Sequence, residues 1–312
     1  MKLKEISTVG MSREDWLKVR RNSIGGSEAA ALLGLNAYSS PYAVWADKLG
    51  LLAEQPVSEA IKIGNDLENY VAHRFTEATG KHVRRKNAIL YNPEFPFAHA
   101  NVDRLIIGEK AGLECKTTNA LMLKKFADGE FPAHYYVQCQ HYMMITNLPK
   151  WYLAVLILGK EFLWFEIPRH EGDIQALAET ERDFWNLVKT KTPPPVDASA
   201  SCSGALSQVY AFADSGTSCD LSGIAEIITL YQNAKNQIAE LKKIADGYEN
   251  QIKAFMQDAE SGSCDGFRIT WKNQSRTSLD SKAIQSEQPE IYQKYLKKSE
   301  SRVFRIKEMK EN

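Results

Sequence analysis

Two side chains of opposite charge, Glu114 and Lys116, flank Cys115 in an apolar run, and Asp103 precedes Glu114 by eleven residues. Because side chains of a strand alternate between its two faces, Glu114 and Lys116 are expected to project to the same side. Asp103 lies in a second strand-like run, residues 98–107, and glycines between the two runs mark a turn. The sequence therefore predicts a hairpin that brings Asp103 beside Glu114.

Two carboxylates placed in this way can hold Mg²⁺ or Mn²⁺, which are hard ions that prefer oxygen ligands and keep several waters. Such an ion acidifies a bound water and polarises a phosphoryl oxygen. Lys116 would orient that water or balance the negative charge that grows on phosphorus. Asp103, Glu114 and Lys116 therefore predict a metal-dependent nuclease centre.

An acid two residues before a lysine is weak evidence by itself, because the spacing recurs three times further along the chain, first at residues 240–242. An isolated pair of this kind is more often a solvated ion pair worth less than ~1 kcal/mol. Glu114 and Lys116 differ because they lie in a strand pattern that follows Asp103. The catalytic interpretation rests on that context.

Two predicted helices carry further polar candidates. In the helix predicted over residues 58–79, Glu68 lies close to the buried stripe, where an unpaired carboxylate is costly. A metal or a lysine would relieve that cost, although a surface ion pair is the commoner fate of a helical glutamate. In the helix predicted over residues 134–147, Gln138 lies one turn before Tyr142. This pair can hold a DNA backbone or position a metal ligand, or it can bond internally.

A possible phosphate site lies between Arg20 and Ser27. The glycines Gly25 and Gly26 are expected to break one short helix, and Ser27 to start the next. Amide groups exposed at such a turn suit a phosphate. An ordinary helix cap between two packed helices is the other interpretation.

The composition fits a soluble globular protein: 44% of the 312 residues are hydrophobic and 25% are charged. No apolar stretch is long enough to span a bilayer, and the first residues lack a secretory signal, so a cytoplasmic protein is expected. Five scattered cysteines predict reduced thiols rather than a metal cluster. Because Lys plus Arg equals Asp plus Glu at 39 each, any affinity for nucleic acid must come from local patches.

Three regions are expected along the chain. Residues 1–192 alternate predicted helices and strands and form the core domain. Residues 193–220, rich in Pro, Ser and Gly, predict a linker. Residues 221–312 predict an extension with a long helix over 224–259, a short strand and a short helix. Because the apolar residues of the long helix follow a heptad pattern, we expect it to pair with another helix of this chain or of a neighbour.

Over residues 12–192 the chain resembles the YqaJ-type viral recombinase family, phage alkaline exonucleases related to lambda exonuclease within the restriction-endonuclease-like PD-(D/E)XK superfamily. The resemblance rests on short segments in a fixed order, at residues 16–20, 24–28, 68, 101–103, 114–116 and 138–142. It implies an α/β fold, with a restriction-endonuclease-like core whose mixed central β-sheet is flanked by helices.

The resemblance also implies a role for each site residue. The metal would be bound by Asp103, Glu114 and the carbonyl of Cys115, and Glu68 would serve a second metal or its waters. Lys116 would assist the attacking water. Gln138 and Tyr142 would complete the catalytic site. DNA phosphates would be contacted by Arg20, Ser27, Asn101 and again Gln138. Arg20 and Ser27 match positions that grip a 5′-phosphate, and Asn101 replaces a small hydroxyl residue of the lambda enzyme.

The family further implies a homotrimeric ring that threads double-stranded DNA, trims the 5′ strand and passes the 3′ tail to a single-strand annealing protein. A Mg²⁺-dependent 5′-to-3′ exonuclease is therefore the first interpretation. Two alternatives remain at this stage, an endonuclease of the same fold and a non-catalytic DNA-binding or assembly protein.

Overall fold

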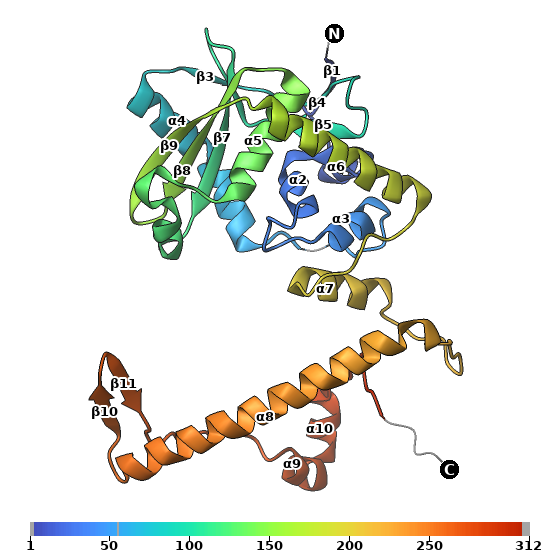
Figure 1. Ribbon diagram of the computed structural model, residues 1–312, viewed down its shortest axis with the longest axis vertical. Helices are drawn as coiled ribbons and strands as arrows, with labels where there is room; N and C mark the ends of the chain where they lie inside the picture. Colours follow the sequence, from blue (N-terminus) through green and yellow to red (C-terminus); the bar gives the residue numbers. More distant parts are fainter. Residues whose placement is uncertain (1–2, 55, 308–312) are drawn as a thin grey trace. The chain divides into compact units, whose positions relative to one another are not determined.

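The computed structural model describes residues 3–54 and 56–307, and the chain divides into two compact units, residues 1–211 and 212–312 (Figure 1). Each unit is built around its own elements, and the candidate site residues all belong to the first. Within the described ranges, no helix combines the length and the apolar character needed to cross a membrane.

A five-stranded mixed sheet forms the centre of the first unit. Its strand order is β3 (Val83–Arg85), β6 (Arg104–Ile106), β7 (Ala111–Thr118), β8 (Lys150–Ile157) and β9 (Glu161–Pro168). β7 and β8 run parallel, whereas the other neighbours are antiparallel. This arrangement confirms the mixed sheet that the resemblance implied.

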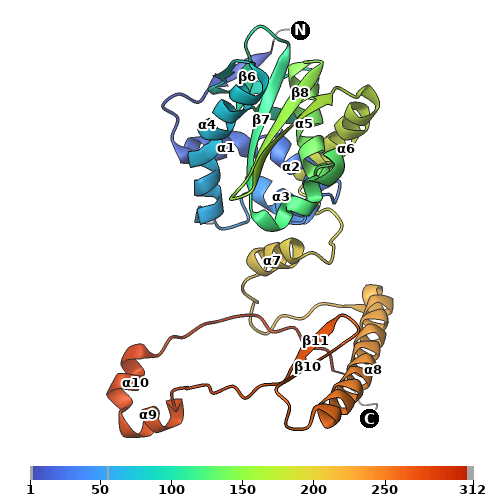
Figure 2. The ribbon, with the colours of Figure 1, turned by 90° about the vertical axis from the view of Figure 1, so that its left-hand side faces the viewer.

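Two helices cover the two faces of this sheet, as Figure 2 shows. α4 (Glu59–Thr79) packs Val71 and Phe75 against Leu113 of β7 and Tyr152 of β8. α5 (Ala133–Thr146) packs on the other face, where Trp151 and its alternate neighbours on β8 point. The alternation therefore places Leu113 toward α4 and leaves Glu114 and Lys116 on the α5 side, as the sequence predicted.

The caps of α4 agree with the sequence. The hydroxyl of Ser58 accepts a hydrogen bond from the amide of Ile61, and Gly80 adopts the left-handed conformation that ends the helix. The predicted strand over residues 98–107 is instead two short strands. β5 (Ala98–Asn101) joins a second sheet with β1 (Lys4–Ser7), β4 (Ala88–Tyr91) and β2 (Ile24–Gly25), whereas β6 joins the central sheet. The chain changes sheet at Val102 and Asp103, where the Asp103 carboxylate accepts a hydrogen bond from the Cys115 amide.

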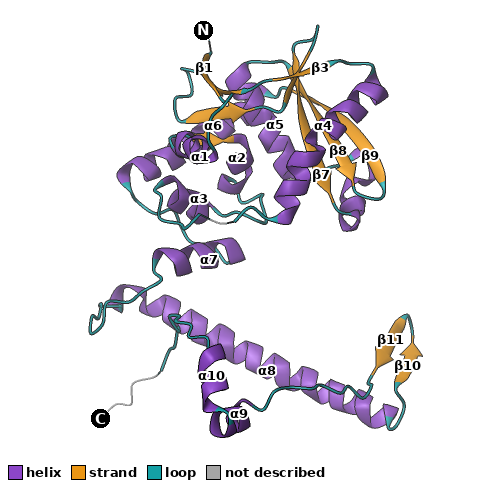
Figure 3. Cartoon of the chain, turned by 180° about the vertical axis from the view of Figure 1, so that it is seen from behind, coloured by secondary structure: helices purple, strands orange, loops and turns teal. Residues whose placement is uncertain are grey.

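Further helices lie together beside α5 (Figure 3). They are α1 (Arg13–Arg21), α2 (Gly26–Leu32), α3 (Pro41–Lys48) and α6 (Glu171–Thr190), and η1 (Ala120–Gly129) precedes α5. The linker prediction for residues 193–220 was wrong in part, because α7 (Ala200–Val209) folds inside that stretch. Cys202 and Ala205 of α7 are buried in one cluster with Trp45 of α3, which gives this short helix an apolar partner surface.

The second unit contains the long helix α8 (Ala225–Met256), which follows η2 (Ser222–Ile224). It also contains the hairpin of β10 (Ser261–Cys264) and β11 (Phe267–Thr270), and the short helices α9 (Ser281–Glu287) and α10 (Pro289–Tyr295). Apolar residues of the heptad pattern such as Ile238, Leu241 and Phe255 are exposed on α8. The pairing of this helix with another one stays a prediction.

Candidate active site

Glu114 is the centre of a buried polar cluster on β7. Its side chain is only 3% exposed, and its Oε1 atom lies 2.5 Å from Lys116 Nζ and 2.7 Å from Gln138 Nε2, which donates to it. The second oxygen, Oε2, is buried and has no hydrogen-bond partner among the described residues. A buried carboxylate oxygen without a donor is costly, so Glu114 presents a vacant acceptor to its surroundings.

Asp103 faces the same cluster. Its Oδ2 atom accepts the backbone amide of Cys115 at 2.8 Å, which fixes the carboxylate beside β7. Burial raises the pKa of Asp103 well above its ordinary value, and repulsion from Glu114 raises it further. Burial alone would lower the pKa of Lys116, but attraction to Glu114 and Asp103 outweighs it and raises the pKa. Lys116 therefore stays charged, in contact with Glu114 and close enough to Asp103 to feel its charge.

This donor set fits a divalent cation. Asp103 and Glu114 offer hard carboxylate oxygens, one of them unpartnered, and a positive ion between them would remove the repulsion that raises the Asp103 pKa. Within residues 3–54 and 56–307, no group of three His, Cys, Asp or Glu side chains is gathered for a metal. Two carboxylates, a backbone carbonyl such as that of Cys115, and waters form a set that Mg²⁺ accepts.

Glu68 is held next to this cluster by an ion pair. The Arg104 guanidinium bonds to Glu68 Oε1, to the Asp103 carbonyl oxygen at 2.7 Å and to Asn69 Oδ1 at 2.7 Å. The ion pair that the sequence left open for Glu68 is thus present. Sequence reasoning gave Arg104 no role, although an arginine inside an apolar strand-like run is a signal of a charge partner, and the structure shows that Arg104 is buried.

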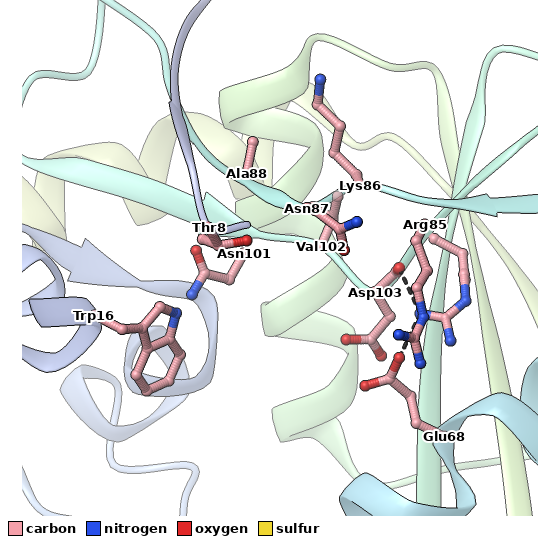
Figure 4. A pocket seen from close by; sticks show the side chains of 11 residues that line it. Thr8, Trp16, Glu68, Arg85, Lys86, Asn87, Ala88, Asn101, Val102 and Asp103 are labelled. Carbon is pink, nitrogen blue, oxygen red and sulfur yellow. Dashed lines mark hydrogen bonds and ion pairs between the residues drawn. The ribbon is translucent and has the colours of Figure 1, made fainter. Parts of the chain in front are cut away.

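A cavity of about 240 Å³ opens beside these groups (Figure 4). Asp103 and Glu68 lie on one side of it, and Trp16 and Asn101 lie on the other. Asn101 Oδ1 is buried without a hydrogen-bond partner among the described residues. The cavity also carries cationic side chains, those of Arg85, Lys86 and Arg104, so its chemistry suits a phosphodiester backbone.

Gln138 and Tyr142 form one hydrogen-bonded unit with Glu114. The Gln138 amide nitrogen donates to Glu114 Oε1 and to the Tyr142 hydroxyl, each at 2.7 Å. Burial raises the pKa of Tyr142 well above its ordinary value, and the Glu114 charge adds to this effect, so the phenol stays neutral. The internal pair that the sequence allowed is therefore present. It orients Glu114, and it leaves the Gln138 amide nitrogen no free N–H for the predicted DNA phosphate.

Arg20 and Ser27 meet at the Gly25 turn, as predicted. Arg20 Nη2 lies 3.1 Å from Ser27 Oγ, and the guanidinium carbon lies 4.5 Å from the centre of the Trp16 ring. Of the two interpretations of this turn, the structure shows the helix cap. α2 begins at Gly26, one residue before the expected Ser27, and the Gly25 amide donates to Glu28 Oε2 at 2.7 Å instead of remaining free. The side chains of Arg20 and Ser27, rather than a ring of amides, would bind a phosphate.

A buried ion pair fixes this turn, and sequence reasoning missed it. Lys48 Nζ lies 2.7 Å from Glu28 Oε2 and donates to the Arg20 carbonyl at 2.9 Å, and the Lys48 side chain is fully buried. Burial would raise the pKa of Glu28, but Lys48 and Arg20 outweigh it and lower the pKa. No signal in the sequence marks the pair, because Lys48 ends a helix beside Asp47 as many exposed lysines do.

The turn is also locked to α5. An added Cβ at Gly26 would lie 2.6 Å from a ring carbon of Tyr142, so only glycine permits the observed approach. Next to Tyr142, the His141 ring bonds Glu181 at 2.7 Å and the His99 carbonyl at 2.8 Å, with both side chains of the His141–Glu181 pair fully buried. The phosphate-site residues and the Glu114 cluster thus share one rigid support.

Comparisons with known proteins agree with this architecture. Residues 15–149 match the model of the YqaJ-like viral recombinase domain. The chain is 42% identical over 304 residues to YqaJ of Bacillus subtilis (strain 168), covering 96% of this chain and 95% of that protein. The crystal structure of LHK-Exo, an alkaline exonuclease from Laribacter hongkongensis, in complex with dAMP aligns with a TM-score of 0.50 and 17% identity. The alignment covers 57% of this chain and 94% of that one, and it supports the mixed α/β fold.

Proposed function

The chain belongs to the YqaJ-like viral recombinase family, and we propose that it is a Mg²⁺-dependent exonuclease that degrades double-stranded DNA from 5′ ends and leaves 3′ single-stranded tails. The observation that carries this proposal is the Glu114 cluster, in which a buried carboxylate oxygen lacks a donor while Asp103 and Lys116 stand beside it. LHK-Exo, which has a similar fold, is an alkaline exonuclease, and this supports the same class of activity.

Hydrolysis of a phosphodiester needs an activated water and compensation of the charge that grows on phosphorus. Mg²⁺ held by Asp103, Glu114 and the Cys115 carbonyl would supply Lewis-acid polarisation and a more acidic water when bound. Lys116, which stays protonated, contributes a positive charge 2.5 Å from Glu114 and balances the transition state. Gln138 and Tyr142 keep Glu114 in one orientation, so little reorganisation is needed during the reaction.

Recognition of an end requires a site for the terminal 5′-phosphate. Arg20 and Ser27 supply a guanidinium and an exposed hydroxyl 3.1 Å apart, on a turn supported by Lys48. Arg20 can bind phosphate oxygens in a bidentate manner, and Trp16 restricts its rotation. This site favours an exonuclease over an endonuclease, because an internal phosphodiester carries no terminal phosphate.

The family resemblance adds partners to the proposal. A homotrimer that encloses the duplex would keep a protein of zero formal net charge on DNA, since salt-sensitive contacts need line only the channel. A single-strand annealing protein would receive the 3′ tail. The heptad pattern of α8 offers one surface for such contacts.

Incubating the purified protein with Mg²⁺ and either linear or covalently closed duplex DNA tests the activity. We expect loss of the linear DNA, protection of the closed circle and no reaction with EDTA. Closed circles degraded at a comparable rate would indicate an endonuclease instead. Lys116→Ala is expected to abolish hydrolysis while DNA binding persists, and an inert wild-type protein that still binds DNA would favour the non-catalytic alternative.

A further inference from the structure

A second cavity opens next to the end of β7, and it shares no lining residue with the cationic cavity. It has a volume of about 360 Å³, at the lower end of the roughly 300–1,000 Å³ of small-molecule sites. It lies between the first turns of α4, the end of β7, η1 and the start of α5. The residues that give it its character are mostly aromatic or apolar, namely Tyr38, Ile63, Met122 and Tyr135, with His134 at the rim. We call it the Tyr135 pocket.

The Tyr135 pocket is directly coupled to the Glu114 cluster. Lys116 Nζ lies 5.6 Å from the centre of the Tyr135 ring, over its face, so a group bound next to Lys116 also borders this ring. His134 packs against Tyr135 with ring centroids 4.1 Å apart, which holds the tyrosine in place. The pocket therefore begins where the cleaved phosphate would lie.

The other wall of the pocket leads toward the phosphate-binding turn. Tyr38 is 83% exposed and lines the Tyr135 pocket, and it also lines a neighbouring depression that contains Glu28. Glu28 is the carboxylate that anchors the Gly25 amide beside Arg20 and Ser27. The pocket thus shares Tyr38 with the depression beside the proposed site of the 5′-phosphate, and it borders Lys116 through the Tyr135 ring.

We propose that the Tyr135 pocket receives the base of the 5′-terminal nucleotide, which stacks on the rings of Tyr135 and Tyr38 while its flanking phosphates lie at Arg20 and Lys116. This inference rests on the proposed exonuclease function and adds a subsite to it. The two cavities suit chemically different parts of the substrate. The cavity of Asp103 and Arg104 suits the charged backbone, and the aromatic pocket suits a base. Stacking tolerates any sequence, because every base offers a flat face.

The test is a comparison of two substrates with two proteins. The substrates are 5′-phosphorylated linear duplexes whose terminal nucleotide either carries its base or is abasic, and the proteins are the wild type and Tyr135→Leu. Loss of one stacking contact corresponds to a decrease in kcat/KM on the order of 5- to 150-fold. We expect this decrease for the abasic substrate with the wild type and for the normal substrate with Tyr135→Leu. The variant should then discriminate less between the two substrates than the wild type does, because only the Tyr38 ring is left for the base to stack on.

Controls separate the ring from the fold. Tyr135→Phe keeps the ring and should retain wild-type discrimination. Tyr38→Leu alters an exposed side chain that the fold does not need, and it should also reduce discrimination, whereas Tyr295→Leu, an equally solvent-facing change in the second unit, should not. If Tyr135→Leu does not fold, the loss of discrimination in Tyr38→Leu tests the proposal instead.

Equal discrimination by the wild type, Tyr135→Leu and Tyr38→Leu would overturn the inference, as would discrimination only when the second nucleotide is abasic. Both results require a wild-type protein that degrades linear DNA. A wild type without this activity contradicts the proposed function itself, so the two failures are distinguishable.

Discussion

Replacing Lys48 with methionine should leave the Glu28 carboxylate without its lysine partner at the proposed phosphate-binding turn. The lysine is fully buried, its Nζ lies 2.7 Å from Glu28 Oε2, and it also donates to the Arg20 carbonyl. Breaking a buried pair by removing one partner costs about 3–5 kcal/mol, and the lower end of this range applies here because the Gly25 amide and Arg20 still stabilise the Glu28 charge. We expect Lys48→Met to lower the free energy of unfolding by this amount at pH 7.

Urea unfolding followed by tryptophan fluorescence measures this loss, since Trp45 is buried in the same helix as Lys48. The matched control is Lys18→Met, which breaks an exposed pair with Glu14 and should leave the unfolding midpoint unchanged. Adding Glu28→Gln to Lys48→Met should recover a large part of the lost stability, because no buried charge then remains unpaired. A Lys48→Met protein within about 1 kcal/mol of the wild type would refute this reasoning.

Three further outcomes follow from the geometry of the first unit. Gly26→Ala should lower the free energy of unfolding by about 1–3 kcal/mol, because the new Cβ would meet the Tyr142 ring at 2.6 Å. Arg20→Ala should reduce the ratio of digestion rates for 5′-phosphorylated and 5′-hydroxyl ends. Hydrogen bonds from Lys150 and Lys81 lower the pKa of Glu109 to about 2. Glu109→Gln should therefore cost about 1 kcal/mol at pH 7, where solvent screens the partly exposed pairs, and the difference from the wild type should shrink as pH falls below about 4.5.

Each of these outcomes has a control. Gly204→Ala, a helical site with no atom within 4 Å of the new Cβ, should not destabilise the protein, and an equal loss at both glycines would contradict the close approach of α2 to α5. An unchanged end preference in Arg20→Ala would withdraw the phosphate assignment. A carboxylate with a lowered pKa stabilises the fold only while it is ionised. A stability difference between Glu109→Gln and the wild type that grows as the pH falls would therefore contradict this assignment.

The sequence predicted the positions that depend on local periodicity and on known motifs. Glu114 and Lys116 share a face because strands alternate, and α4 begins and ends at Ser58 and Gly80 because those residue types cap helices. The hairpin predicted from the glycine turn correctly brought Asp103 to β7. Each of these features is decided within a few residues of the chain.

The missed features depend on contacts between distant segments. The Lys48–Glu28 pair joins residues 20 positions apart, and the His141–Glu181 pair joins residues 40 positions apart. No local sequence pattern indicates either pair. The change of sheet at Val102 is likewise decided by tertiary packing. The helix α7 was missed because its Ser, Ala and Gly composition resembles a linker, and burial of Cys202 overrides that tendency.

Binding of Mn²⁺, followed by electron paramagnetic resonance, tests most directly whether Asp103 and Glu114 together hold a metal. Titration of the wild type should show saturable binding, and Glu114→Gln should bind at least about 10-fold more weakly because a charged ligand is lost. Lys18→Met, far from β7 in sequence and exposed, should bind as the wild type does. Equal affinity of the wild type and Glu114→Gln would contradict the metal-dependent centre from which the proposed nuclease activity is derived.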